Sequence, residues 1–472
     1  MKYKLGFLLA AALACLGAPA RAEQSGGNEA RPGNAPPSKG TPPSPAPRKP
    51  VELSEKRTPP DYDGRGGPPT TAGDVLLWGP RLLLVPPYFV SEYVIRRPLG
   101  WAIAGAERAG LPAYLYNFFT FGPDHNAGIF PTFFIDFGFY PSVGAFAFWN
   151  DAFAKGHDLR LRGATWGKNW LAASFAERYH IGKEPLDVIA LEGRYLKRPD
   201  YTFFGLGPDS RQSALLRFGQ TELEAKTYLR RQFWRRSLVY GEVGIESNEF
   251  TPGGLADDPL LSDAIRTGSV PAPPGYDGYT VVRSSLLATL DSRPTGARPG
   301  SGVRVAAGVG HSSELRHDTT FVRYGGSLAG FLDVNDRKRV VSLALGARFT
   351  DPIARGEVPF TEQVTLGGDE PMRGFYENRL IGESAVVADL GYRWPIWMWL
   401  DGTMHAELGN VFGPHLSGFS PGKLRFSGAI GVEDTNPGDN RTQFLIGFGS
   451  ETFESGGKVS SFRFLFGTTY GF

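Results

Sequence analysis

The amino-acid sequence predicts an all-β fold: an antiparallel transmembrane β-barrel of about 16 strands over residues 128–472. Three observations predict it. Short segments of alternating apolar and polar residues, separated by turn residues, follow one another along this part of the chain. The gaps between them tend to alternate between long and short. The final segment has one aromatic-rich face and one face of mostly small or charged residues.

Composition supports this fold class and excludes others. Aromatic residues make up 13% of the 472 residues, with 34 Phe and 62 Gly. No apolar run approaches the roughly 18 residues that cross a bilayer as a helix, so any membrane span would be a strand. The net charge of +2 argues against an electrostatic nucleic-acid binder, which would carry a strong basic excess.

Residues 1–22 resemble a secretory signal peptide. Lys2 and Lys4 supply its positive start, residues 5–16 its apolar core, and Ala20-Arg21-Ala22 its cleavage site. Cys15, the one cysteine of the chain, lies within this segment. The mature chain is therefore predicted to have no disulfide and no thiolate chemistry. A lipid-modified Cys15 is the alternative interpretation.

Two segments separate the signal peptide from the predicted barrel. Residues 23–73 are dominated by Pro, Gly, Ser and charges, which predicts a disordered tether in the periplasm. Residues 74–127 contain two short helical patterns, over 88–97 and 99–109, and Gly110 ends the second. This segment either plugs one barrel end or lies on the inner leaflet, and the sequence does not choose between them.

The candidate strands are each near the length of about 9 to 11 residues that a tilted membrane strand needs. They are 128–138, 143–150, 158–166, 169–179, 187–197, 221–231, 237–248, 279–291, 301–311, 321–333, 339–349, 383–393, 402–411, 423–433, 441–449 and 460–472. The longest gaps, 198–220, 249–278 and 350–382, all follow odd-numbered strands. With the N-terminus in the periplasm, these gaps lie outside the cell, where outer-membrane barrels carry their long loops.

The last candidate strand shows the alternation most clearly. Its lipid-compatible row is Phe462, Phe464, Phe466, Thr468, Tyr470 and Phe472. The opposite row is mostly small or charged, as a lumen-facing row should be, with Leu465 as the exception. The strand also resembles the closing strands of outer-membrane barrels, which end on an aromatic residue. That resemblance implies an assembly signal formed by Phe466, Tyr470 and Phe472.

A Gly-rich loop with one embedded arginine precedes the twelfth candidate strand. Gly367 and Gly368 lead into Met372-Arg373-Gly374-Phe375. This motif resembles the (V/M)-R-G-(F/Y) loop of the BamA/TamA family, within the bacterial surface antigen or outer membrane protein 85 superfamily. It also lies at the family's position, between strands eleven and twelve. The resemblance implies that the loop folds into the lumen and that its arginine pairs with a carboxylate on the strand after next.

Strand parity places three carboxylates on the lumen side of consecutive strands, those of Asp389, Glu407 and Glu433. The segment 404–411 resembles the family's F-x-D-x-G-type motif, with Glu407 where the family usually has Asp. We therefore expect Arg373 to pair with Glu407, with Glu433 and Asp389 as alternates. In the alternative interpretation Arg373 is a plain lumen-facing charge.

A second segment, Tyr201–Gly207, resembles the F-x-G-x-G-type outer-loop segment of the same family. Family members that assemble proteins usually carry periplasmic POTRA domains of about 75 residues each, and the Pro-rich tether lacks the apolar residues to form one. The chain therefore resembles members without POTRA domains. Its soluble periplasmic partner, if one replaces them, is unknown.

Enzyme interpretations are weaker. Residues 418–422 match G-x-S-x-G, but Pro421 follows the serine and has no N–H for an oxyanion hole. His405 beside Glu407 hints at acid–base chemistry, although a plain polar pair is the simpler interpretation. The seven histidines show no metal-ligand spacing. We expect no catalytic residue, no cofactor and no metal.

The functional expectation follows mainly from the resemblance. It implies a barrel of the bacterial outer membrane that inserts or translocates protein or lipid without catalysis, through a seam between its first and last strands. Expected partners are outer-membrane lipid and an unfolded outer-membrane protein or lipid substrate, and no nucleic acid. A passive, porin-like channel is the alternative, and a membrane-embedded hydrolase is a third.

Overall fold

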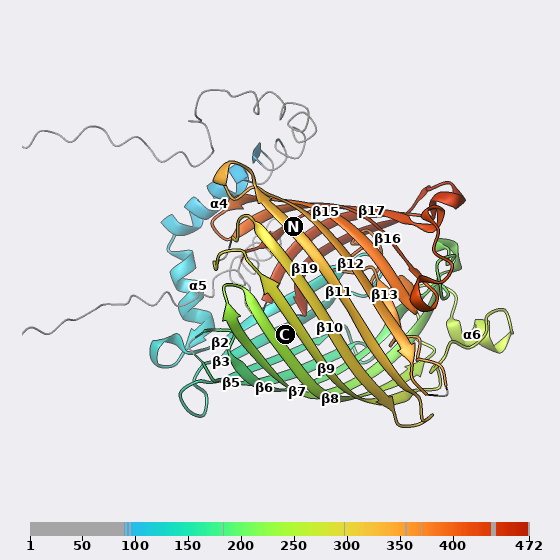
Figure 1. Ribbon diagram of the computed structural model, residues 1–472. Coiled ribbons are helices and arrows are strands. Elements are labelled where there is room, and N and C mark those ends of the chain that lie inside the picture. Colours follow the sequence, from blue (N-terminus) through green and yellow to red (C-terminus); the bar gives the residue numbers. More distant parts are fainter. Residues whose placement is uncertain are drawn as a thin grey trace, which may run out of the picture. The chain divides into compact units, whose positions relative to one another are not determined.

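The computed structural model describes residues 89, 92, 93, 96–182, 184–296, 298–354, 356–369, 371–435 and 440–470. Its main feature is a closed antiparallel barrel (Figure 1). The sheet has 17 strands, and without the two-residue β1 it forms the predicted ring of 16. The predicted signal peptide and tether lie outside the described residues, as does half of the helix predicted over 88–97.

Every candidate strand corresponds to one strand of the ring. The bounds are β2 Ala127–Asp136, β3 Ser142–Trp149, β4 His157–Thr165, β5 Leu171–His180, β6 Val188–Phe203, β7 Leu216–Trp234, β8 Ser237–Thr251, β9 Tyr279–Asp291, β10 Gly302–Glu314, β11 Thr320–Asp333, β12 Val340–Pro352, β15 Ser384–Trp397, β16 Leu400–Phe412, β17 Arg425–Asp434, β18 Asn440–Ser450 and β19 Val459–Tyr470. The largest boundary error is at β6, where the prediction ended before Pro199. The ladder between β6 and β7 shifts register between Arg198 and Tyr201 and then continues, so an irregularity absorbs this proline.

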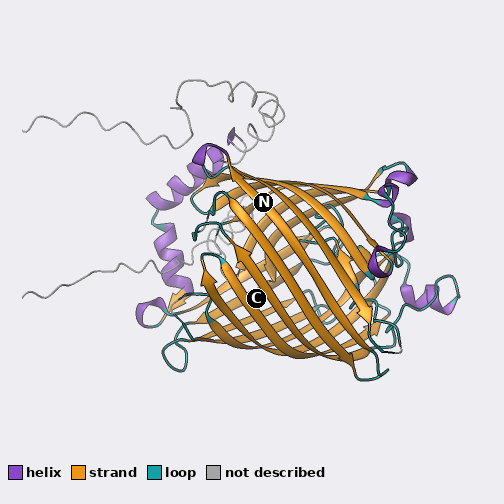
Figure 2. Cartoon of the chain, viewed as in Figure 1, coloured by secondary structure: helices purple, strands orange, loops and turns teal. Residues whose placement is uncertain are grey.

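The two ends of the barrel differ as predicted. The connections after β6, β8 and β12 are long, and the one after β8 holds the short helix α6 (Leu261–Arg266). At the opposite end, residues 235–236 and 398–399 alone join β7 to β8 and β15 to β16. Strands cross the drawing from end to end, with loops gathered at both rims (Figure 2).

Side chains alternate between lipid and lumen along each strand. In β16, Leu408 is exposed on the outside, whereas its neighbour Glu407 is buried inside. In β19, Phe462 is exposed and Leu465 is buried. Leu465 is the apolar exception that the sequence predicted in the lumen-facing row. It is buried there because it packs in an apolar cluster with Ala429 of β17 and Leu445 of β18.

Two helices precede the barrel. The second predicted helix corresponds to α4 (Arg97–Arg108), and Gly110 follows it in the left-handed conformation with φ 64°. The sequence did not predict α5 (Leu111–Phe119), which leads into β1 (Thr120–Phe121) and then β2. Both helices lie at the barrel end opposite α6 (Figure 1). Among the described helices, none is long and apolar enough to cross a bilayer.

Candidate functional site: the lumen loop and the barrel seam

Residues 353–383, called here the lumen loop, connect β12 to β15 and pack inside the barrel. Two short strands, β13 (Val364–Leu366) and β14 (Leu380–Gly382), pair with each other at its base. Between them, Met372 and Phe375 are fully buried and share one apolar cluster with inward-facing residues of β15 and β16. The motif of residues 372–375 is therefore held against the inner wall.

Glycines allow the motif to approach the wall at backbone distance. A Cβ at Gly374 would overlap the backbone carbonyl of Phe448 in β18. A Cβ at Gly449 of the same strand would overlap the ring of Phe375. The loop and β18 are thus complementary surfaces in which each glycine leaves room for the other element.

Arg373 contacts two of the three carboxylates that parity placed on the lumen side. Its backbone N–H donates to Glu407 Oε2 at 2.7 Å, and its guanidinium Nη1 donates to Glu407 Oε1. The same Nη1 lies 3.4 Å from Asp389 Oδ2. Glu407 also accepts a 2.7 Å hydrogen bond from the hydroxyl of Ser427, which in turn accepts the Gly374 N–H at 2.9 Å. Both oxygen atoms of the Glu407 carboxylate therefore accept hydrogen bonds from Arg373 of the loop, and Ser427 links the same carboxylate to Gly374.

The histidine of this cluster contacts Asp389 rather than Glu407. His405 Nδ1 lies 3.0 Å from Asp389 Oδ1. The ligand atoms of Asp389, His405 and Glu407 lie within 4.8 Å of one another, so these three side chains could together hold a cation. The Arg373 guanidinium supplies positive charge at the same place, which makes the arrangement an ion-pair cluster.

The structure does not bring Glu433, the third candidate, to Arg373. Glu407 is aligned with Ser427 in the β16–β17 ladder, whereas Glu433 is aligned with Asp401, six residues further along the strand. Parity gives the face on which a side chain lies but not its height along the barrel axis. Glu433 is therefore predicted on the correct face of its strand, but it lies too far along the barrel axis from Glu407 to share its contact with Arg373.

Over the residues that the structure describes, the ladder between β19 and β2, called here the seam, is the shortest of the ring. It aligns three residue pairs, Leu465 with Asp136, Phe466 with Ile135, and Gly467 with Phe134. The Phe137 N–H adds a 2.9 Å hydrogen bond to Phe464 O. The other ladders of the described ring align seven or more pairs each.

A proline on the seam edge of β2 contributes to the short pairing. Phe137 donates its N–H to β19 and the Phe133 carbonyl accepts from Thr468, so odd-numbered residues present their backbone groups to this edge. Pro131 is odd-numbered and has no N–H to donate. Proline is tolerated in strands mainly at edges, and Pro131 lies beyond the three residue pairs aligned at the seam.

A buried ion pair crosses the seam and reaches the lumen loop. Arg463 of β19 binds Asp136 of β2, with Nη2 and Nε at 2.8 and 3.1 Å from Oδ2, and the two residues are 2% and 4% exposed. Arg463 Nη1 also donates to Gly368 O at 2.5 Å. The Ser461 hydroxyl donates to Gly374 O at 2.9 Å. First strand, last strand and loop are therefore joined at one place.

The Omp85 superfamily domain matches residues 261–469, which include the motif, its partners and β19. Over this part of the barrel, from α6 to β19, the chain is similar to the Omp85 superfamily. BamA from Haemophilus ducreyi lacking POTRA domains 1–3 is 15% identical over 73% of this chain and 70% of that chain, with a TM-score of 0.50, a likeness of fold. CdiB from Acinetobacter baumannii is 12% identical over 73% and 59%, with a TM-score of 0.44, and OmpT of Vibrio cholerae is 9% identical over 74% and 99%, with a TM-score of 0.28. No curated protein sequence matches the chain.

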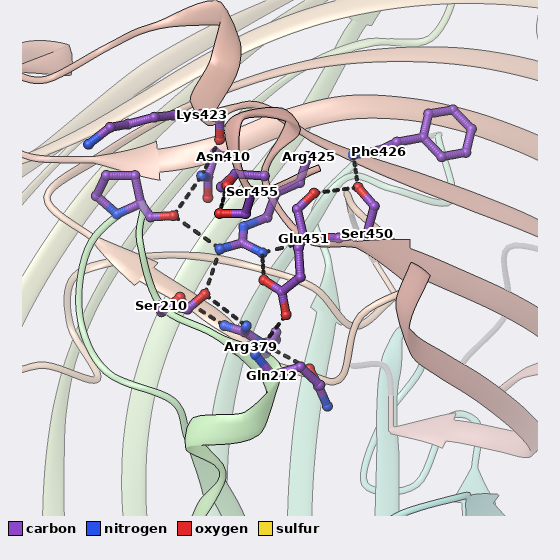
Figure 3. A network of polar contacts seen from close by, with 12 residues as sticks. Ser210, Gln212, Arg379, Asn410, Lys423, Arg425, Phe426, Ser450, Glu451 and Ser455 are labelled. Atoms are coloured by element: carbon purple, nitrogen blue, oxygen red, sulfur yellow. Dashed lines mark hydrogen bonds and ion pairs between the residues drawn. The ribbon is translucent and has the colours of Figure 1, made fainter. Parts of the chain in front are cut away.

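The barrel also anchors its lumen loop through two buried arginines that the sequence did not single out, shown in Figure 3. Arg379 donates to Ser210 Oγ and O at 2.8 and 3.0 Å and to Gln212 Oε1 at 3.0 Å. Arg425 donates to Ser210 O at 2.5 Å and to Glu451 Oε2 at 2.7 Å. These five residues, called here the outer network, join the lumen loop to the connections after β6 and β18.

The outer network holds two guanidiniums and one carboxylate in a buried place. Burial, together with the nearby charge of Arg425, lowers the pKa of Arg379 to about 9. Burial acts to raise the pKa of Glu451, but hydrogen bonds from the Gln212 N–H and the Arg425 guanidinium hold that pKa below its usual range. Phe204, within the segment that resembles the family's outer loop, packs its ring 4.2 Å from the Arg379 guanidinium.

The base of the lumen loop contacts the opposite wall. Glu362 lies 3.2 Å from Arg283 of β9 and 3.0 Å from Arg323 of β11, and it accepts from the Tyr279 hydroxyl at 3.1 Å. The loop therefore extends across the lumen from β9 and β11 to β19.

The sequence also pointed to the serine of the G-x-S-x-G match and to the aromatic residues of the closing strand. Ser420, of the G-x-S-x-G match, accepts a 3.3 Å hydrogen bond from Gly422 N–H and begins a short 3-10 turn. Of the proposed closing-strand signal, Phe466 lies in the seam ladder and its ring is 5.2 Å from that of Phe133. The side chain of Tyr470 and all of Phe472 lie outside the described residues.

Proposed function

We propose that this barrel inserts or translocates a substrate, an unfolded outer-membrane protein or a lipid, by opening the seam between β2 and β19. The observation that carries the proposal is the three-pair ladder at this one place in the ring. The mechanism is not catalytic. An opened seam presents two strand edges, and a free edge pairs readily with another extended chain.

The energetics favour opening at the seam over every other ladder. A backbone hydrogen bond contributes about 0.5–1.5 kcal/mol net, so a ladder with few pairs separates at a smaller free-energy cost than one with many. Most of the resistance to opening then comes from side chains, above all the Arg463–Asp136 pair. Such a pair can be re-formed after opening, which a reversible gate requires.

The lumen loop supports this function as a fixed internal element. Its tip is bound to Glu407, Ser427 and Ser461, on three of the last four strands of the ring. It therefore holds the β16–β19 side of the seam in one shape while β2 moves away. Because the loop also extends across the lumen, this arrangement favours a gated barrel over a passive channel.

The same geometry supports an orientation in the outer membrane. α4 and α5 lie at the end with the two-residue turns, and long connections lie at the other end. Outer-membrane barrels carry short turns on the periplasmic side. The proposal therefore places the N-terminal tether in the periplasm, where a soluble partner could deliver the substrate.

A disulfide across the seam tests the function. Ile135→Cys with Phe466→Cys joins two aligned, outward residues of β2 and β19. The purified protein in liposomes is compared with protein-free liposomes for the folding rate of an unrelated small outer-membrane protein. We expect acceleration by the reduced variant, loss after oxidation, and recovery with reductant.

The matched control joins a ladder that should not open. Ala147→Cys with Leu161→Cys links aligned residues of β3 and β4, and oxidation should leave the acceleration unchanged. Equal rates for the oxidised and reduced seam variants would contradict the seam mechanism. No acceleration by the wild-type protein would contradict a general insertase activity.

A further inference from the structure

α5 carries large apolar side chains on two separate faces. Leu115 and Phe119, four residues apart, pack against the inward-facing Phe130 and its neighbours at the barrel mouth. Tyr114 and Phe118 have the same spacing, and their rings stack with centroids 6.2 Å apart. These two residues are 64% and 66% exposed. The barrel therefore covers one face of the helix and leaves the other bare.

The composition of α5 is that of a helix with an apolar environment on more than one side. Residues 111–119 include no charged side chain. Two of the three polar side chains are those of Tyr114 and Tyr116, whose rings suit the boundary between water and lipid. A helix that is apolar nearly all round is buried in protein or faces a membrane. Because Tyr114 and Phe118 are exposed, the chemistry of their face fits a bilayer.

The register of β1 sets the height of α5 against the bilayer. Phe121 follows the helix by two residues and is aligned with Ala127 of β2, which is aligned with Trp149 of β3. Aligned residues of antiparallel strands share a face, and this is the lipid face, where Ile129 of β2 is exposed as well. Aromatic residues at the ends of the lipid-facing band mark the interface between membrane and water. Trp149 ends β3, so α5 reaches the barrel at that interface.

The bare face of α5 continues into the lipid-facing surface of the barrel. Phe118 comes three residues before Phe121, and both are exposed. In α4, Trp101 is 78% exposed, whereas Ile103 is buried. Positions two apart point to nearly opposite sides of a helix, so α4 also has a packed side and a bare side. Exposed apolar surface of this kind marks a contact site, and its continuity with the barrel surface makes lipid the occupant.

We propose that α4 and α5 form a lipid-binding surface, with Trp101, Tyr114 and Phe118 in contact with the leaflet at this end of the barrel. In the orientation proposed above, this is the periplasmic leaflet. The partner is the boundary between headgroups and acyl chains, where tryptophan and tyrosine are enriched in membrane proteins. The segment thus contacts both surroundings that the sequence left open, the barrel mouth and the membrane. This lipid contact goes beyond the proposed function, because it requires no opening of the seam.

Fluorophores on single cysteines test the contact. The chain has one cysteine, so in a Cys15→Ser background one introduced cysteine carries an environment-sensitive dye. The purified protein is placed in phosphatidylcholine liposomes with brominated acyl chains. We expect these chains to quench the dye in Tyr114→Cys and in Phe118→Cys. Ala113→Cys and Asn117→Cys, at a third pair of exposed positions on the same helix, are the matched controls, and aqueous iodide should quench them instead.

Two outcomes of this experiment would overturn the inference. Equal quenching by iodide at all four positions would show that α5 lies in water. Shielding of Tyr114→Cys and Phe118→Cys from both quenchers would show that protein, such as a second copy of this chain, covers the bare face in place of lipid.

Phe118→Ser measures how much one ring contributes. Hydrogen exchange of residues 113–119 in liposomes should speed up about tenfold, the effect expected when one phenyl ring no longer holds the helix to lipid. Phe118→Leu keeps an apolar side chain, and Asn117→Ser changes the third pair of positions, so both should exchange as the wild type does. Exchange in Phe118→Ser at the wild-type rate would also overturn the inference.

Discussion

The wall formed by β7 and β8 and the seam formed by β19 and β2 use opposite means to hold two strands together. The wall aligns 15 residue pairs from Gly219–Thr251 to Trp234–Ser237. The seam aligns three pairs and adds a buried ion pair with a third partner in the lumen loop. Backbone pairing makes the wall permanent, and side-chain pairing makes the seam adjustable.

Removing the ion pair should produce the largest difference between the two regions. Asp136→Ala leaves the buried Arg463 guanidinium with the carboxylate of Asp369 alone, 3.4 Å away and partly exposed, and the expected loss of unfolding free energy is about 3 kcal/mol. Urea unfolding in micelles, followed by tryptophan fluorescence, measures it. Lys226→Ala removes longer ion pairs from β7, 3.7 Å to Glu192 of β6 and 3.5 Å to Glu224 of the same strand, and should cost less, because Glu224 keeps its contact with Arg194. Equal losses in both variants would show that the seam does not depend on this pair.

Arg373→Ala should have the next largest effect. The Glu407 carboxylate keeps its hydrogen bonds from the backbone N–H and Ser427 but loses its cation, for an expected cost of about 2–3 kcal/mol. Limited proteolysis of the lumen loop should speed up, and acceleration of outer-membrane protein folding should fall. Glu407→Gln paired with Arg373→Ala should recover part of the stability, because no buried charge is then unpaired. A double variant less stable than Arg373→Ala would contradict the pairing.

Gly449→Ala tests how tightly the lumen loop packs against β18 near the seam. The new methyl group overlaps the ring of Phe375, and we expect a loss of about 1–3 kcal/mol, with the loop displaced from β18. Gly330→Ala in β11 meets open space and should change stability by less than about 0.5 kcal/mol. Urea unfolding of the two variants compares them directly. A tolerated Gly449→Ala would show that the loop adapts its position easily.

The smallest expected effect is a pH dependence of the outer network. Because the folded-state pKa of Glu451 is lowered from 4.5, its stabilising contribution is present above pH 4.5 and is lost as the pH falls through the lowered pKa. The protection of residues 204–215 from hydrogen exchange, corrected for the intrinsic exchange rate at each pH, should therefore fall in acid. Glu451→Gln should exchange faster at neutral pH and show no such step. A wild-type profile that is flat down to pH 3 would exclude Glu451 as the controlling group.

The strands could be predicted from sequence because each has its own alternation of apolar and polar residues. That the motif of residues 372–375 points into the lumen could be predicted only from a family resemblance. The Arg463–Asp136 pair could not. Its members are 327 residues apart, and the relative height of the first and last strands depends on the stagger of the whole ring. Two signals were nevertheless present. Arg463 is the one charged residue in β19, and Pro131 interrupts the first strand.

The remaining errors have the same cause. Glu433 failed as a partner because alternation carries no information about height. Ser210 and Gln212 come from the connection after β6 and Glu451 from the one after β18, and these two connections gather around the buried arginines only after the ring closes. β1 has two residues and no detectable period, so no local pattern could have assigned it to the edge of β2.

The separation of Asp136 from Arg463 has a consequence for the order of events during synthesis. Asp136 is made first of the three, the loop carbonyl of Gly368 much later, and Arg463 later still. A chain whose synthesis stops before β19 cannot neutralise the buried carboxylate of its first strand. The ion pair therefore forms only in a chain that includes β19. Because β19 brings the cation that pairs with the carboxylate of β2, a product truncated before β19 remains chemically distinct and open to degradation.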